Sequence, residues 1–153
     1  MAAPTPDAAI AQPAAAGQGL IDYPLGREGP ATGALQSIAA GLRWARLPLP
    51  GSLGHINVWL IDGAGGSAIV DTGIALDGCR DAWDALFAGP LADWHCDRII
   101  VTHMHPDHVG LAGWLQQRSG APLMMTRGEY LTALVAQRDE GGLGAQSWAK
   151  QRI

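Results

Sequence analysis

The sequence predicts an α/β (α+β) fold, in which a mixed or parallel β-sheet carries helices packed on one side. Apolar residues make up 48% of the 153 residues, which is enough to form a hydrophobic core. From residue 41 on, short apolar runs of strand character are interspersed with segments of helical periodicity. The strand-like runs come first and a strand–helix–strand–helix order follows, which is typical of sheets covered by helices.

The first part of the chain differs from the rest in composition. Residues 1–38 are rich in Ala and Pro, and no Lys or Arg comes before Arg27. This segment lacks the basic and compact apolar regions of a secretory signal and the several arginines of a transit peptide. We therefore expect a disordered tail over 1–38, one domain over 39–153 and a cytoplasmic location.

Three strands are predicted before the first helix. Residues 42–47 alternate in polarity and end before a proline, and residues 55–61 are rich in β-branched and aromatic side chains. Residues 67–70 are short and apolar, as in a buried strand. Asp62 and Gly63 supply a turn signal between the last two runs, which predicts a β-hairpin.

The middle of the chain predicts one helix followed by one strand. Residues 77–87 have helical periodicity, with Asp77 as the expected N-cap and Gly89 as the expected end of the helix. Residues 98–102 form the next apolar run and indicate another buried strand.

The last predicted elements are a helix, a short strand and a second helix. Residues 108–118 carry apolar side chains at helical spacing and are followed by a glycine. Residues 122–125 indicate a short strand. Thr126 and Glu129 have the spacing of a capping box, and residues 130–135 continue the helical pattern.

Charge, hydropathy and cysteine content exclude several function classes. The net charge of −4 argues against a dedicated nucleic-acid binder, which would present a basic face. No uninterrupted apolar run approaches the ~18 residues of a membrane span. Cys79 and Cys96 are the two cysteines, too few for a disulfide scaffold or a four-thiolate zinc site. We expect neither nucleic acid nor a membrane as a partner.

The strongest chemical signal is a cluster of histidines and one aspartate after the strand predicted over 98–102. His103 and His105 are two residues apart, so on an extended strand end both imidazoles can face one metal ion. Asp107 and His108 fall in the turn that follows and can face a second, neighbouring cation. Imidazole and carboxylate are the expected ligands of Zn²⁺ or iron, and without a metal such a cluster would be costly to bury.

Asp71 is the second signal, because it ends the buried strand predicted over 67–70 with a carboxylate. If this strand neighbours the one before the histidines, Asp71 can accept a hydrogen bond from a metal-binding imidazole or fix the loop that carries it. The alternative is an Asx-turn that only shapes the chain. His55 and His95 stand alone, and we expect them to be structural or exposed.

The run from Thr102 to Gly110, preceded by Val-Asp-Thr-Gly at residues 70–73, resembles the metallo-β-lactamase-fold hydrolases, most closely the glyoxalase II-like and lactonase-like ones. The resemblance extends over most of 42–135. It implies an αββα sandwich built from two similar halves, with two metal ions in a cleft. It also implies that His103 and His105 bind the first ion, and Asp107 and His108 the second, with Asp71 behind the ligands.

The same resemblance implies the reaction. In the family a metal-bound hydroxide attacks an ester, thioester, lactone or amide carbonyl of a small-molecule substrate. Asp107 would orient the nucleophile as well as bind the second ion. Zn²⁺ is the implied metal, with Fe or Mn as alternatives.

The chain departs from the family pattern after His108. The family's remaining metal ligands come later in the chain, but no histidine follows His108 and Asp139 is the only later aspartate. We therefore expect the N-terminal half of the fold alone, with weak metal binding and little activity. The alternatives are an inactive metal-binding remnant and a mononuclear iron protein similar to persulfide dioxygenases.

A half-fold would leave one face of its sheet uncovered. We expect apolar area at Leu60, Ile69 and Ile100 to remain exposed and to promote self-association.

Overall fold

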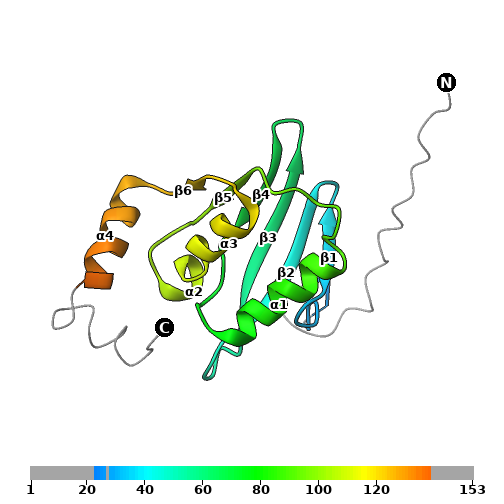
Figure 1. Ribbon diagram of the computed structural model, residues 1–153. Helices are drawn as coiled ribbons and strands as arrows, with labels where there is room; N and C mark the ends of the chain where they lie inside the picture. Colours follow the sequence, from blue (N-terminus) through cyan, green and yellow to red (C-terminus); the bar gives the residue numbers. More distant parts are fainter. Residues whose placement is uncertain (1–22, 27, 139–153) are drawn as a thin grey trace.

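The computed structural model describes residues 23–26 and 28–138, which form a six-stranded sheet with four helices (Figure 1). The strands are β1 (Leu35–Ala39), β2 (Leu42–Pro48), β3 (His55–Gly63), β4 (Gly66–Val70), β5 (Arg98–Ile100) and β6 (Leu123–Met124). The helices are α1 (Asp77–Ala88), α2 (Pro106–Val109), α3 (Ala112–Ser119) and α4 (Arg127–Arg138).

The sheet is mixed, as the sequence predicts. The strand order in space is the order in the chain, β1 to β6. Strands β1 to β4 are antiparallel, and β4, β5 and β6 are parallel. The predicted hairpin is confirmed, since β3 and β4 pair down to Gly63 opposite Gly66. The parallel pairs need long connections, which α1 and the segment with α2 and α3 provide.

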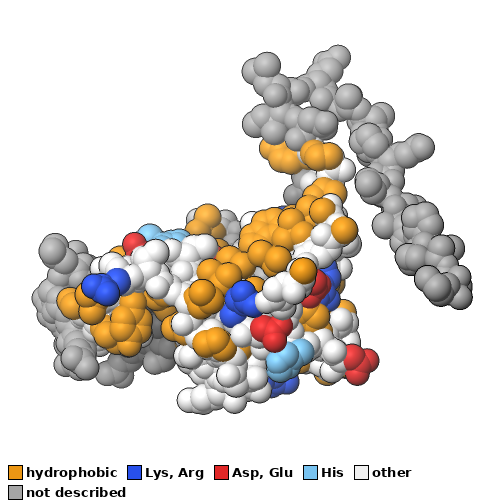
Figure 2. Space-filling view, turned by 90° about the horizontal axis from the view of Figure 1, so that it is seen from above, with side chains coloured by type: hydrophobic (Ala, Val, Ile, Leu, Met, Phe, Trp, Pro, Cys, Tyr) orange, Lys and Arg blue, Asp and Glu red, His pale blue; other side chains and the backbone are white. Residues whose placement is uncertain are grey.

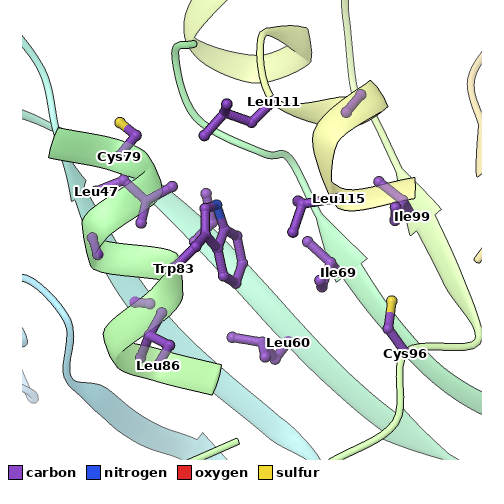
Figure 3. Close-up of a cluster of buried hydrophobic side chains, with 14 of the residues drawn as sticks. Leu47, Leu60, Ile69, Cys79, Trp83, Leu86, Cys96, Ile99, Leu111 and Leu115 are labelled. Atoms are coloured by element: carbon purple, nitrogen blue, oxygen red, sulfur yellow. The ribbon is translucent and has the colours of Figure 1, made fainter. Parts of the chain in front are cut away.

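The main hydrophobic core lies between the sheet and helices α1 and α3 (Figure 3). Trp83 of α1 is fully buried and points between the two helices toward the sheet. Alternate strand residues, among them Leu60, Ile69 and Ile99, point to the same side and are fully buried. Burying one such side chain contributes about 1.5–3 kcal/mol, so this layer holds the helices on the sheet.

The opposite face of the sheet corrects one prediction from the sequence. Leu60 and Ile69 were expected to be exposed, but they lie on the face that the helices cover. Because successive side chains alternate between faces, the opposite face carries Ile61, whose exposed fraction is 40%, and the half-buried Trp59 and Ile100. The register pairs Trp59 with Val70 of β4, which continues this apolar face.

The tail predicted over 1–38 overlaps β1, so that prediction was wrong for residues 35–38. The segment has one β-branched residue, Ile38, and no aromatic residue, which is a weak strand signal. Its strand conformation comes from pairing with β2, where Leu35 lies opposite Ala45. Residues 1–22 of the predicted tail lie outside the described residues.

Two helix boundaries also differ from the prediction. Asp77 is the first residue of α1 rather than its N-cap, which is Leu76. The helix predicted over 108–118 is two helices, α2 and α3, because the backbone N–H of Leu111 donates to the carbonyl oxygen of Gly73 at 3.1 Å. That bond draws the chain toward the end of β4. Gly120 ends α3 in the left-handed conformation, as predicted.

Helix α4 lies beyond β6, at the end of the molecule away from α1 (Figure 1). Its side chains Tyr130, Leu131 and Val135 are exposed, and Ala133 is buried. Figure 2 shows hydrophobic side chains gathered at this end of the surface. None of the described helices is long and apolar enough to cross a membrane.

Candidate metal centre

The candidate site lies where two parallel strands end. Strands β4 and β5 pair with Val70 beside Ile100, so their carboxyl ends reach the same edge of the sheet. Asp71 follows β4 directly, and the histidine loop, defined here as residues 102–108, begins just after β5. The backbone N–H of Asp71 donates to the carbonyl oxygen of Ile100 at 2.8 Å, which ties the two strand ends together.

Asp71 is the buried polar centre of the site. The residue is 5% exposed and has a φ of 63°, in the left-handed region that Asp tolerates better than most residues. Its Oδ1 accepts hydrogen bonds from the backbone N–H and the hydroxyl of Thr102, at 2.8 and 2.9 Å. Its Oδ2 lies 2.8 Å from Nδ1 of His108. The carboxylate therefore joins both ends of the histidine loop.

The contact with Asp71 sets which nitrogen of His108 is free. An ionised carboxylate only accepts hydrogen bonds, so the proton between the two groups belongs to Nδ1 of His108. The lone pair is then on Nε2, which faces Oδ2 of Asp107 at 3.6 Å. A carboxylate behind an imidazole in this way is a common means of orienting metal-binding histidines. This is the contact that the predicted role of Asp71 requires.

Thr102 extends the same constraint to His103. Its hydroxyl oxygen lies 2.9 Å from each oxygen of Asp71 and 3.0 Å from Nδ1 of His103. Because the hydroxyl has one proton, it donates to Asp71 and accepts from Nδ1 of His103. The lone pair of His103 is therefore also on Nε2. No role for Thr102 was predicted, and its position next to His103 was the only signal in the sequence.

The three imidazoles of the loop gather in one place. Nε2 of His103 faces Nδ1 of His105 at 2.9 Å, with ring centroids 4.6 Å apart. The ring of His103 also lies 4.0 Å from that of His108. Burial, then the neighbouring His108 and His105, lower the pKa of His103 below its ordinary value. A lowered pKa keeps the lone pair of Nε2 available for a ligand.

Thr72, which is fully buried, fixes the end of the histidine loop. Its backbone N–H and its hydroxyl both donate to the carbonyl oxygen of His108, at 2.9 and 2.7 Å. Its own carbonyl oxygen accepts a hydrogen bond from the indole of Trp83 at 2.8 Å. The hydrophobic core under α1 is thus connected directly to the loop. Thr72 lies in the Val-Asp-Thr-Gly motif at residues 70–73, but no role was predicted for it.

Glu129 was predicted to complete a capping box with Thr126. The backbone N–H of Glu129 does donate to Oγ1 of Thr126, at 3.3 Å. The carboxylate, however, accepts a hydrogen bond from the backbone N–H of Met104 at 2.8 Å, inside the histidine loop. No sequence pattern signals this contact, because it joins residues 25 apart.

The remaining histidines and the cysteines occupy other parts of the fold. His55 begins β3 opposite Pro48, and His95 is exposed with Nε2 3.6 Å from Oδ1 of Asp97. Cys79 and Cys96 are buried free thiols, and burial raises the pKa of both. A raised pKa keeps these thiols protonated, which makes them poor metal ligands.

The donor atoms of the site suit a metal ion in type. Imidazole nitrogen and carboxylate oxygen are ligands of Zn²⁺ and related ions. They come in two pairs, His103 with His105 and His108 with Asp107. Within residues 23–26 and 28–138, no group of three or more His, Cys, Asp or Glu side chains is arranged to hold a metal ion. The donors therefore fit a metal ion in chemical type and form pairs rather than a set of three.

Comparison with known proteins decides the family. The model of the metallo-beta-lactamase superfamily matches residues 51–140, which include the end of β4 and the whole histidine loop. The chain belongs to this superfamily. Its fold is thus of the metal-dependent hydrolase type, and membership supports the use of a metal ion in general. No curated protein matches the chain.

Solved structures of metallo-beta-lactamase type resemble the chain over part of their length. A beta-lactamase domain protein from Burkholderia ambifaria is 40% identical, with a TM-score of 0.68 over 76% of this chain and 37% of that one. A metallo-beta-lactamase family protein from Thermus thermophilus is 29% identical, with a TM-score of 0.58 over 74% of this chain and 38% of that one. A metallo-beta-lactamase from Pontibacter korlensis is 16% identical and shares the fold, with a TM-score of 0.51. The match covers 71% of this chain and 49% of that one.

These matches confirm the fold that the resemblance implied. The mixed sheet with helices on one face corresponds to part of the metallo-beta-lactamase domain. The chain spans 37% and 38% of the length of the Burkholderia and Thermus proteins.

Proposed function

We propose that this chain carries the metal-binding part of a metal-dependent hydrolase. His103 and His105 would hold one divalent ion, and Asp107 and His108 a second. The observation that carries the proposal is the pairing of Nε2 of His103 with Nδ1 of His105 at 2.9 Å, beside a His108 whose Nε2 faces Asp107. An N–H···N hydrogen bond joins the two rings, with Nδ1 of His105 donating to Nε2 of His103, and a metal ion would take the place of the shared proton.

Zn²⁺ is the proposed ion, because neutral imidazole and carboxylate are its usual nitrogen and oxygen ligands. Iron and manganese remain the alternatives, and an iron form would favour a mononuclear dioxygenase-like activity at His103 and His105. The chemistry that such an ion supplies is activation of a water molecule near neutral pH for attack on a carbonyl carbon. The proposed substrate is a small molecule with an ester, thioester, lactone or amide bond.

The chain's own residues have separate roles in this proposal. Asp71 keeps the Nδ1 proton on His108 and, through Thr102, the Nδ1 proton on His103, so that both Nε2 atoms present lone pairs. Asp107 would help to hold the second ion, and its carboxylate would orient a water molecule for attack. Its Oδ2 is the oxygen that faces His108.

We propose that the 153-residue chain alone binds metal weakly and has little activity. Each pair provides two protein ligands, whereas a catalytic zinc ion normally has three. The same observation favours the second candidate function, a metal-binding remnant without activity. The two candidates differ only in turnover, so binding and activity must be measured separately.

Metal content tests the proposal directly. The chain is dialysed against Zn²⁺, Fe²⁺ or Mn²⁺ and analysed for bound metal, beside a His103→Ala/His105→Ala variant and a His55→Ala/His95→Ala control. Weak Zn²⁺ binding that the first variant loses and the control keeps is expected. Equal binding by all three chains would refute the site. If one or more Zn²⁺ ions per chain remain bound after treatment with a mild chelator, weak binding is refuted.

Activity separates the hydrolase from the remnant. The zinc-loaded chain is assayed against a thioester, a lactone and an aryl ester, with Asp107→Asn as the matched variant. Low turnover that Asp107→Asn abolishes supports the hydrolase. No turnover above the rate of free Zn²⁺ on every substrate supports the remnant.

We also propose that the chain associates with a second copy through the sheet face opposite the helices. Exposed Ile61 on β3 and exposed Met124 on β6 support this, together with the half-buried Trp59. Sedimentation should show a dimer or larger species that Ile61→Lys converts to monomer, whereas Leu53→Lys, on an exposed turn, leaves it unchanged. A wild-type chain that remains a monomer at high concentration would refute the proposal.

A further inference from the structure

Helix α4 contacts the histidine loop through Glu129. The helix begins at Arg127, and its first turn is fixed by Oγ1 of Thr126, which accepts the backbone N–H of Glu129 at 3.3 Å. The side chain of Glu129 then reaches the loop, where its Oε2 accepts the backbone N–H of Met104 at 2.8 Å. A carboxylate that accepts a backbone N–H makes a charge-assisted hydrogen bond, which is stronger than a neutral one.

The position of Met104 gives this bond its meaning. Met104 is the residue between His103 and His105, whose facing nitrogens are 2.9 Å apart. The peptide that joins His103 to Met104 carries the bonded N–H, so its orientation affects the direction in which both imidazoles leave the backbone. The bond to Glu129 holds that peptide in one orientation.

The rest of the loop is held from another side. Asp71 and Thr72, at the end of β4, bind Thr102 and His108 at the two ends of the loop. Neither residue has a hydrogen bond to Met104 among those that the structure shows for residues 23–26 and 28–138. The centre of the loop is thus fixed by α4, and its ends are fixed by β4.

We propose that Glu129 is a positioning residue for the first metal pair, which holds the 103–104 peptide so that the nitrogens of His103 and His105 converge. This rests on the proposed metal-binding function of the two histidines. The reach of the Glu129 side chain decides whether the bond forms, and its charge adds to the strength of that bond. Helix α4 is therefore part of the metal centre, although its outer face is exposed.

Three variants separate acceptor geometry from charge. Glu129→Gln keeps an acceptor oxygen at the same reach and removes the charge. Glu129→Asp keeps the charge but is one methylene too short for the 2.8 Å contact. Glu129→Ala removes both, and Thr126→Ala loosens the first turn of α4 without touching the loop.

The first measurement needs no metal. Amide hydrogen exchange of Met104 is followed by NMR in the metal-free chain. We expect exchange to be about tenfold faster in Glu129→Ala and Glu129→Asp than in the wild type, and within about threefold in Glu129→Gln. Thr126→Ala should change it by less than Glu129→Ala does. An unchanged Met104 amide in Glu129→Ala would refute the contact itself.

The second measurement follows the imidazole resonances of His103 and His105 during Zn²⁺ titration. Half-saturation should shift to about tenfold higher Zn²⁺ in the Asp and Ala variants, and Glu129→Gln should restore it to near the wild-type value. Wild-type behaviour of Glu129→Asp with loss in Glu129→Gln would show that charge, not geometry, matters. Equal loss in Thr126→Ala and Glu129→Ala would reduce the role to helix packing.

The two measurements also distinguish the failure of each proposal. If Zn²⁺ moves neither imidazole in the wild type, the proposed metal site is refuted and the positioning role with it. The Met104 amide would then still report whether α4 is attached to the loop. If Zn²⁺ binds and no Glu129 variant shifts the titration, only the positioning role is refuted.

Discussion

The two ends of the site are held in different ways. His108 is bound at its side chain by Asp71 and at its carbonyl oxygen by Thr72, and both partners are buried. His105 is exposed, and the polar contact that the structure shows for its side chain is with His103. The second pair is therefore attached to the core through His108. In the first pair, His103 contacts Thr102, and Glu129 holds the peptide between His103 and Met104. Substitution of His108 should lower both stability and metal binding, whereas substitution of His105 should lower metal binding alone.

The largest expected effect is at Asp71. Asp71→Ala leaves the Thr102 N–H and the His108 Nδ1–H without their acceptors and places Ala at a φ of 63°. We expect a loss of about 3 kcal/mol in the free energy of unfolding, measured by urea denaturation with tryptophan fluorescence.

Asp71→Asn is the matched control for this change. Asn tolerates the left-handed region and keeps one acceptor for Thr102, so its loss should be clearly smaller. A loss below about 1 kcal/mol in Asp71→Ala would show that the buried carboxylate does not brace the loop.

The next largest effect is expected at Gly110, between α2 and α3. A Cβ there would meet the carbonyl oxygen of Pro106, the amide nitrogen of Ala75 at 2.8 Å and the carbonyl oxygen of Gly73 at 2.9 Å. These are backbone atoms that cannot rotate away, so Gly110→Ala should destabilise the chain by about 2 kcal/mol. Gly113→Ala, which faces open space in α3, should stabilise it by up to about 1 kcal/mol. Thermal unfolding followed by circular dichroism tests both, and equal melting temperatures would contradict the close packing of α2 on the end of β4.

His108 and His105 compare the two ends directly. His108→Ala should lower the free energy of unfolding by about 1–2 kcal/mol, because it leaves the Asp71 carboxylate underbonded in the core. His105→Ala should stay within about 0.5 kcal/mol of the wild type. Both variants should lose Zn²⁺ binding in equilibrium dialysis. Equal stability losses would mean that the loop is held uniformly.

The smallest effect concerns Asp97, a second carboxylate that accepts a backbone N–H across neighbouring strands. It accepts the N–H of Ser67 at 2.6 Å, and this bond, then the Ser67 hydroxyl, lowers the pKa of Asp97 below 3.8. A lowered folded-state pKa means that the stabilisation is present above pH 3.8 and is lost as the pH falls through the folded value.

Urea unfolding between about pH 5 and pH 2.5 tests this sign. Asp97→Asn should show a shallower loss of stability over that range than the wild type, with a small difference at neutral pH because the group is exposed. Identical slopes would show that the bond to Ser67 contributes nothing at acid pH.

Local patterns predicted most of the elements. The strands at 42–47, 55–61 and 67–70, the hairpin and helix α1 follow from alternation, periodicity and turn residues, which act between near neighbours. What they missed depends on distant partners. Strand β1 exists because β2 pairs with it, and the break between α2 and α3 exists because Gly73 accepts a hydrogen bond from Leu111.

The residues of the candidate site could be predicted from the sequence, but the hydrogen bonds that hold the histidine loop could not. The spacing of the histidines predicted that His103, His105 and His108 lie together. In the structure the ring centroid of His103 is 4.6 Å from that of His105 and 4.0 Å from that of His108. The bracing by Thr102 and Glu129 was not predicted, because it requires the register of β4 with β5 and the direction of α4. The role of the three histidines as metal ligands stays a prediction.

The strands lie in the sheet in the same order as in the chain, because each strand pairs with the one before it. The first four strands are joined by short turns, so their contacts are local and should form early in folding. The hydrogen bond between Asp71 and His108 joins residues 37 apart and must wait for the crossover through α1. We expect pulse-labelling exchange to show protected amides in β2 and β3 before Thr102 is protected. A nascent chain would then acquire its hairpins first, and its histidines would meet only after the sheet beneath them had formed.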